Sequence, residues 1–178
     1  AAAGDLDLWV NGWFGTHDTY IKEAKGKVKA IGNVMSKGGL QGYLIDKRSA
    51  DKFKIKTVMD IKKHAKQFDS NGDGKADMVA CPPGWGCEKQ ITKHFAELGL
   101  GDFINPVQAD YSASMADAIA KFKNGKSVLF YTWTPNWTVG ALELGKDIVW
   151  IEVPYSQTKT VKVPNATKSK INMGFGAD

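Results

Sequence analysis

The stretch 112–133 constrains the fold most, because a helical pattern in it is followed at once by a fully apolar run. Met115, Ile119 and Phe122 recur at spacings of four and three residues, which places them on one face of a helix. The next segment, SVLFYTW, has the continuous apolar character of a strand that is covered on both faces. A helix that leads into such a strand predicts an α/β fold.

The ends of this predicted helix carry suitable capping residues. Ser112 or Ser114 can accept a hydrogen bond from a free backbone N–H at its start. Asn124-Gly125 supplies the left-handed stop that commonly ends a helix. We therefore expect the helix to lie between these positions.

The rest of the chain adds strand and helix patterns in alternation. Strands are predicted at 6–12, 41–46 and 148–153, helices at 49–53, 58–68 and 88–98, a polar helix-tolerant stretch at 17–29 and a loop at 157–170. With 178 residues the chain has the length of one domain or slightly more. The pattern predicts a largely parallel or mixed sheet.

The charge distribution argues against nucleic-acid binding. The formal net charge is +5, yet Arg48 is the single arginine among 24 basic residues. Proteins that read nucleic acids rely on arginine for bidentate contacts. The densest basic stretch, 47–66, is interpreted as a solvated helix face rather than a phosphate-binding surface. No apolar run approaches 18 residues, so no membrane span is predicted.

The six tryptophans fall into two groups. Trp9 and Trp150 lie in predicted strands, where packing in the core is the expected role. The other four stand beside Gly, Pro or Asn where an element ends, namely Trp13, Trp85, Trp133 and Trp137. Aromatic side chains at such ends are poorly placed for a core and well placed for a ligand.

A group of converging indole faces suits a quaternary ammonium ion. Such a cation has no N–H to donate, so it is attracted by the negative faces of aromatic rings instead. If the ligand also carries a carboxylate, Gly86 and Cys87 offer backbone N–H groups at the start of a predicted helix. His17, four residues after Trp13, can donate a further hydrogen bond. The residues thus favour a small zwitterionic ligand.

Cys81 and Cys87 are the two cysteines of the chain. They form no C-x-x-C pair and have no second pair of ligands, which argues against a zinc site. His94 offers little support for a thiol nucleophile, since no residue that would orient it is placed by a motif. A local disulfide in an oxidising compartment is the simpler interpretation.

The segment 69–77 resembles the first half of a calcium-binding loop. Asp69, Asn71, Asp73 and Asp77 have the required spacing, but the twelfth position is Ala80, so the usual bidentate acid is missing. Turns rich in Asp and Asn look much the same. Both interpretations, a bound Ca²⁺ and a plain turn, remain open, and no metal ligand is assigned.

Several motifs resemble those of the periplasmic glycine betaine-binding proteins of proline/glycine betaine ABC importers. The resemblance is carried by QGYLIDK, FDSNGDGKAD, CPPGWGCE and YTWTP, and extends more weakly over 4–18. It implies one lobe of a type II periplasmic binding protein fold with partial stubs of the other lobe. Implied boundaries are 1–39 for a first-lobe stub and hinge, 40–163 for the second lobe, and 164–178 for a return hinge and stub.

The resemblance also implies site residues. Trp13, Trp85 and Trp133 would form a cage for the cation, His17 and the N–H groups of Gly86 and Cys87 would hold the carboxylate, and Cys81 and Cys87 would form a disulfide. Trp137 lies outside the implied cage. The expected partners are glycine betaine and, in the full-length family, a membrane ABC permease. No cofactor is implied, and the expected location is the periplasm.

Alternatives to betaine binding follow from the length of the family, whose members extend beyond this chain on both sides. The chain is expected either to pair with a second copy that restores the missing surface, or to fold as a lobe without betaine affinity. A carbohydrate-binding module, in which tryptophans stack on sugars, is a further alternative. An enzyme is disfavoured because no Ser-His-Asp order, metal triad or phosphate loop is present.

Overall fold

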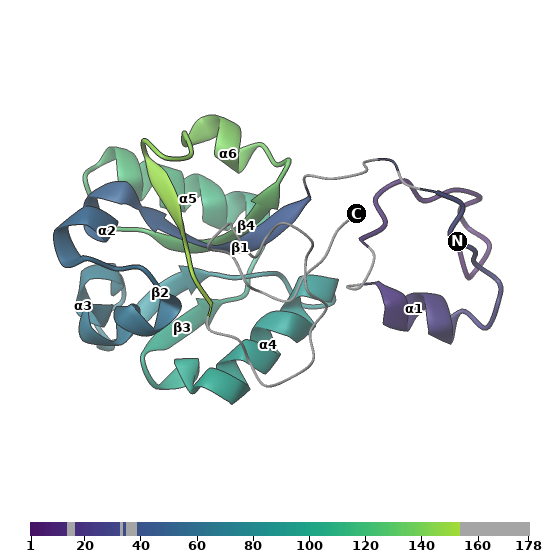
Figure 1. Cartoon of the computed structure of the whole chain (residues 1–178), viewed down its shortest axis with the longest axis horizontal. Helices are drawn as coiled ribbons and strands as arrows, with labels where there is room; N and C mark the ends of the chain where they lie inside the picture. Colours follow the sequence, from purple (N-terminus) through teal and green to yellow (C-terminus); the bar gives the residue numbers. More distant parts are fainter. Residues whose placement is uncertain (14–16, 33, 35–38, 154–178) are drawn as a thin grey trace.

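A five-stranded mixed sheet forms the centre of the computed structural model, which describes residues 1–13, 17–32, 34 and 39–153 (Figure 1). The sheet order is β3-β2-β4-β1-β5. The strands are β1 (Leu40–Asp46), β2 (Ala76–Val79), β3 (Ile104–Val107), β4 (Leu129–Thr134) and β5 (Ile148–Ile151). β2 pairs in parallel with β3 and β4, whereas β1 is antiparallel to β4 and β5. The predicted α/β class with a mixed sheet is confirmed.

Helices cover both faces of this sheet. They are α2 (Lys47–Phe53), η1 (Val58–Lys63), α3 (Ala65–Phe68), α4 (Gly86–Leu98), η2 (Leu100–Asp102), α5 (Tyr111–Lys123) and α6 (Thr138–Ala141). A further helix, α1 (Asp18–Glu23), lies away from the sheet with the N-terminal segment (Figure 1). α4 connects β2 to β3 and α5 connects β3 back to β4, so the two crossovers run in opposite directions across the sheet. Because both are expected to be right-handed, α4 and α5 lie on opposite faces, as Figure 1 shows.

The core is centred on β4 and β1. The four residues from Leu129 to Thr132 are all buried, as are Tyr43, Leu44 and Ile45 of the neighbouring strand. This confirms that the run SVLFYTW forms a strand covered on both faces. On α5, Met115 and Ile119 are buried against the sheet, while Phe122 is partly buried at the edge of the core.

The start of α5 differs from the prediction. Its cap is Asp110, whose carboxylate accepts a hydrogen bond from the N–H of Ala113 at 2.8 Å, and not Ser112 or Ser114. Tyr111 is already helical, so both serines lie within the first turn. The predicted stop is confirmed, because Gly125 has φ +77° directly after the last turn.

The predicted helix 58–68 is divided in two. η1 and α3 are separated by His64, whose backbone (φ −129°, ψ 17°) is outside the helical region and therefore interrupts the helix. A capping box between Thr57 and Asp60 fixes the start of η1. The other predicted helices and the strands at 41–46 and 148–153 are present, with ends that shift by one to two residues.

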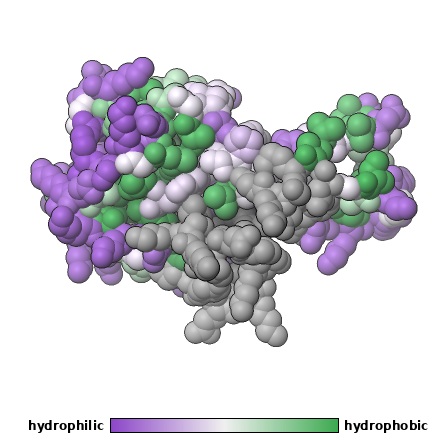
Figure 2. Space-filling view, turned by 45° about the horizontal axis from the view of Figure 1, so that its top comes forward, coloured by the Kyte–Doolittle hydropathy of each residue, from purple (hydrophilic) through white to green (hydrophobic). Residues whose placement is uncertain are grey.

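The prediction of a strand at 6–12 is wrong. These residues pair with no strand among those that the structure describes, and Trp9 and Trp13 both direct their indole N–H to Asn11. Trp9 is 57% exposed, so its assignment to the core is wrong as well. An alternating pattern requires a neighbouring strand to receive its backbone hydrogen bonds, and the described residues provide no such strand for this segment. Figure 2 shows apolar residues exposed on this N-terminal segment.

Some predictions fall outside the described residues. These are the loop at 157–170, the return hinge at 164–178 and the last residues of the proposed second lobe. Within the described part of the chain, no helix is long and apolar enough to cross a membrane.

Candidate functional site

Three aromatic residues gather where three neighbouring parallel strands end. Trp85 follows β2, and Tyr111 follows β3 as the first residue of α5. Trp133 is the last residue but one of β4. These strands are adjacent in the order β3-β2-β4, so their carboxyl ends meet at one edge of the sheet. In open α/β sheets this edge is where ligands bind.

The three rings are in mutual contact. The ring centroids of Trp85 and Trp133 are 5.8 Å apart with an interplanar angle of 69°. Tyr111 lies 5.0 Å from Trp133 and 6.0 Å from Trp85. Two indole planes at such an angle form a corner rather than a stack. Trp85 is 44% exposed and Trp133 is partly buried, so this corner is accessible at the surface of the lobe.

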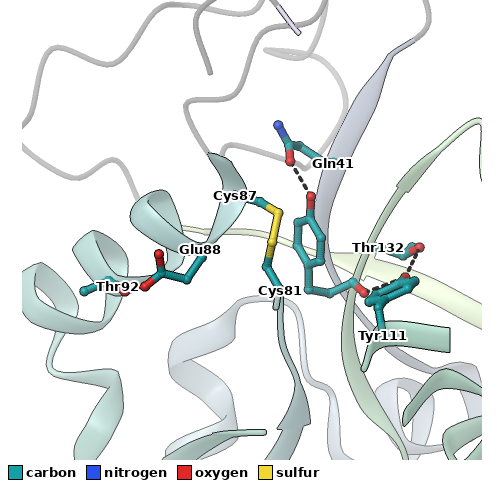
Figure 3. The surroundings of a disulfide bond; sticks show 8 residues. Gln41, Cys81, Cys87, Glu88, Thr92, Tyr111 and Thr132 are labelled. Carbon is teal, nitrogen blue, oxygen red and sulfur yellow. Dashed lines mark hydrogen bonds between the residues drawn. A yellow bond between two sulfur atoms is a disulfide. The ribbon is translucent and has the colours of Figure 1, made fainter. Parts of the chain in front are cut away.

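Tyr111 is the member of this group that sequence reasoning missed. It is only 4% exposed, and its hydroxyl lies 2.7 Å from Thr132 Oγ1 and 3.1 Å from the carbonyl oxygen of Tyr131 (Figure 3). Burial raises the pKa of Tyr111 to about 12, although hydrogen bonds to Thr132 and Thr138 oppose this shift. No local pattern in the sequence marked Tyr111, because its contacts with the two indoles follow from the order of the strands.

The amino terminus of α4 adjoins the aromatic corner, because Trp85 is its N-cap and Gly86 its first residue. Among the described residues, the N–H groups of Gly86 and Cys87 donate no hydrogen bond. Glu88 bears the nearest acidic side chain on the helix, but it accepts from the hydroxyl of Thr92 at 3.2 Å, one turn further on (Figure 3). The free N–H groups and the helix dipole thus favour an anionic group here.

A disulfide joins Cys81 to Cys87, as the spacing and the resemblance suggested (Figure 3). Both cysteines are buried. The bond connects the residues that follow β2 to the first turn of α4, and Trp85 lies inside the loop that it closes. The disulfide therefore restricts the backbone that carries both the indole and the N–H groups.

His17 and Trp13 form a compact turn of their own. The N–H of Trp13 donates to His17 Nδ1 at 3.1 Å, and the N–H of His17 donates to the carbonyl oxygen of Trp13 at 2.8 Å. Burial lowers the pKa of His17, while the charge of Asp18 opposes this effect. The neutral ring therefore accepts through Nδ1 and carries its proton on Nε2, which is available as a donor.

Helix α1, which follows His17, lies next to α4. The ammonium of Lys89 is 4.5 Å from the ring centroid of Tyr20, and a hollow of about 410 Å³ lies between the two helices, with Gly86 in its lining. Among the described residues, the ring of Trp13 contacts neither Trp85 nor Trp133. The structure thus brings two of the three predicted cage residues together, and holds the third on a neighbouring segment.

Trp137 lies apart from the aromatic group. It is the N-cap of α6 and is 49% exposed, and its ring contacts none of the other rings in the described part of the chain. It remains outside the candidate site.

The loop at 69–77 has the hydrogen bonds of an Asp/Asn-rich turn. Asp69 accepts from the N–H groups of Asn71, Gly72 and Gly74, and Asp77 accepts from Ser70 and from two amide side chains. Hydrogen bonds from Gly72 and Gly74 are the main cause that lowers the pKa of Asp69. Within the described residues, no group of three or more His, Cys, Asp or Glu side chains is arranged to hold a metal ion. This geometry favours the interpretation as a turn.

The mixed sheet with helices on both faces is the fold of about half of a type II periplasmic binding protein. A solved structure of a glycine betaine, L-proline transporter-binding protein from Borrelia burgdorferi superposes with a TM-score of 0.67 at 20% identity, covering 86% of this chain and 52% of that one. Lactococcal OpuAC in complex with glycine betaine gives a TM-score of 0.63 at 19% identity, covering 86% and 54%. These likenesses concern the fold.

The chain belongs to the family described as the substrate binding domain of the ABC-type glycine betaine transport system, whose model matches residues 1–170. Members of this family are substrate-binding proteins of ABC importers and not enzymes. The glycine betaine/proline betaine-binding periplasmic protein of Escherichia coli K12 is 42% identical over 182 residues. The glycine betaine-binding periplasmic protein OusX of Dickeya dadantii is also 42% identical, over 178 residues. The alignments cover 98% of this chain, which spans about half the length (54%) of these relatives.

Proposed function

We propose that this chain is the ligand-holding portion of a periplasmic binding protein that delivers glycine betaine, or a related quaternary ammonium osmolyte, to an ABC importer. The observation that carries the proposal is the corner formed by Trp85 and Trp133 beside the amino terminus of α4. The names of the relatives, which describe glycine betaine binding and a periplasmic location, support the same ligand and location.

The cation would be held by the aromatic faces. A trimethylammonium group placed in the corner contacts both indoles and cannot hydrogen-bond to any competing acceptor. Each ring contributes about 1–2 kcal/mol once the cation is desolvated. Trp13 would supply a third face when its segment closes on the lobe.

The carboxylate would be held at the amino terminus of α4. The N–H groups of Gly86 and Cys87 have no other acceptor among the described residues, and the helix dipole favours negative charge there. His17 would donate through Nε2, since its Nδ1 already accepts from Trp13. Together with the rings, these charge-assisted bonds are consistent with micromolar affinity, about −8 kcal/mol.

The proposed arrangement divides the chain at a hinge. Residues 1–39 would belong to the first lobe and its hinge, residues 40–163 to the second lobe, and residues 164–178 to the return hinge. A second copy of the chain would be able to supply the surface that the longer relatives contribute from their additional length.

Isothermal titration with glycine betaine, choline and proline betaine tests the proposal. The matched control is 3,3-dimethylbutanoate, which has the shape and carboxylate of glycine betaine but carbon in place of the charged nitrogen. We expect micromolar binding of glycine betaine and no binding of this analogue, which keeps the carboxylate but lacks the positive charge. Absence of heat at millimolar betaine, or retention on polysaccharide that betaine does not release, would contradict the proposal.

A further inference from the structure

Tyr111 lies beneath the aromatic corner and touches both of its walls. Its ring is 5.0 Å from the centroid of Trp133 and 6.0 Å from that of Trp85. With only 4% of its surface exposed, it is covered by the structure around it. It therefore offers little surface to a ligand, and any influence on binding has to pass through the two indoles.

The hydroxyl of Tyr111 begins a buried chain of hydroxyl groups. It donates toward Thr132 Oγ1 at 2.7 Å (Figure 3). Thr132 Oγ1 is in turn 2.6 Å from Thr138 Oγ1. Both threonines are fully buried. The chain joins the first residue of α5, the middle of β4 and the first residue of α6.

These bonds surround the segment that carries Trp133. Thr132 precedes Trp133 on β4, and Thr138 follows the turn into α6. The backbone on both sides of the indole is thus tied to Tyr111 through hydroxyl groups, while the ring of Tyr111 supports the indole directly. The residue acts on the same side chain in two independent ways.

We infer that Tyr111 is a positioning residue that sets the angle between Trp85 and Trp133, and thereby the affinity of the corner for a quaternary ammonium ion. The inference rests on the function proposed above. Without the ring of Tyr111, Trp133 can move into the vacated volume and close the corner. Without the hydroxyl, the ring support remains but the backbone around Trp133 is held less firmly.

Two variants separate these roles in the whole chain. Tyr111→Leu removes the ring, and Tyr111→Phe removes only the hydroxyl. Tyr43→Phe is the matched control, because Tyr43 is also buried, has its hydroxyl 3.4 Å from His94 Nδ1, and makes no ring contact with a tryptophan among the described residues. The readouts are betaine affinity by titration and the near-ultraviolet circular dichroism of the ligand-free protein, which reports the coupling of the two indoles.

We expect Tyr111→Leu to weaken betaine binding by about tenfold or more and to change the near-ultraviolet spectrum. For Tyr111→Phe we expect a loss of about fivefold, which corresponds to one buried hydrogen bond. The control should keep parent affinity and spectrum. A folded Tyr111→Leu variant with both parent affinity and parent spectrum would overturn the inference.

Two further outcomes are distinguishable. If Tyr111→Leu does not fold, betaine affinity is measured on Tyr111→Phe and Thr138→Val to test the role of Tyr111. Each of these variants removes one end of the hydroxyl chain and keeps the side-chain volume. Parent affinity in both would overturn the inference. If the parent protein itself binds no betaine, the proposed function fails, and the spectra alone then decide whether Tyr111 positions the indoles.

Discussion

The indole planes of Trp85 and Trp133 stand at 69° to one another with their centroids 5.8 Å apart. The two residues come from the ends of β2 and β4, which are neighbours in the sheet. Their meeting is therefore a product of the strand order, and it explains how distant segments of the chain build one corner.

Replacing Trp133 should weaken betaine binding much more than replacing Trp150. Trp133→Ala removes one wall of the corner, and we expect a loss of at least about tenfold, in line with 1–2 kcal/mol per desolvated ring. Trp150 is also partly buried and packs against the core from β5, so Trp150→Ala is a control for lost packing. Titration of both folded variants measures the difference, and equal losses would contradict the proposed role of Trp133.

The two nitrogens of His17 should be separable by substitution. His17→Gln places a donor near the position of Nε2, whereas His17→Asn places an acceptor near the position of Nδ1, which receives the Trp13 N–H. If Nε2 donates to the carboxylate, the Gln variant should bind betaine more tightly than the Asn variant. The reverse order in a titration at pH 7.5 would assign the contribution of His17 to the turn alone.

The lowered pKa of His17 predicts a pH effect on stability. The folded protein binds a proton on His17 less readily than the unfolded chain does, where the pKa of His is about 6.5. The stabilising contribution of neutral His17 to the free energy of unfolding is therefore complete above pH 6.5. It should be lost as the pH falls from there through the lowered value. Chemical unfolding gives the free energy of unfolding at pH 7.5 and at pH 5. The decrease between these two pH values should be smaller for His17→Gln than for the parent protein. If the decrease is the same in the variant and the parent, His17 is ruled out as the source of the pH dependence.

Removing the cap of α5 should destabilise the lobe. Asp110→Ala eliminates the hydrogen bond to the N–H of Ala113, and we expect the free energy of unfolding to fall by about 1 kcal/mol. Ser112→Ala is the control, since Ser112 is exposed within the first turn. Urea unfolding of the two variants gives the comparison. A larger effect of the serine variant would contradict the cap assignment.

The turn at 69–77 should be insensitive to calcium. The carboxylate of Asp69 is already used by three backbone N–H groups, so thermal unfolding should be the same with added calcium and with chelator. Asp69→Ala should lower the melting temperature, while Asp5→Ala, at an exposed N-terminal position, should not. Because the pKa of Asp69 is lowered in the folded protein, its contribution to stability is complete above pH 3.8 and is lost as the pH falls through the lowered value. A calcium-dependent rise in melting temperature would restore the metal interpretation.

Patterns within a single element predicted the fold well. The run SVLFYTW and the spacing of Met115 and Ile119 sufficed for β4 and α5, because the periodicity that marks a buried face is contained within the sequence of each element. The pattern at 6–12 was misleading for the opposite reason. A strand depends on a partner elsewhere, and alternation alone does not provide one.

The site was predictable only as far as its residues stood out locally. Trp85 and Trp133 were recognisable beside Gly and Pro, and Cys81 and Cys87 by their spacing. Tyr111 was not, since its contacts come from strand order rather than from neighbouring residues in the sequence. Its hydroxyl partners, Thr132 and Thr138, carry no local signal for the same reason.

The strand order has a consequence for synthesis of the chain. β4 lies between β1 and β2 in the sheet, although both of those strands are made earlier. On the ribosome, Trp85 therefore emerges well before the strand that will bring Trp133 beside it. The corner proposed for the cation can therefore form only after residues 129–134 have inserted between β1 and β2, which makes it one of the last features of the sheet to be completed.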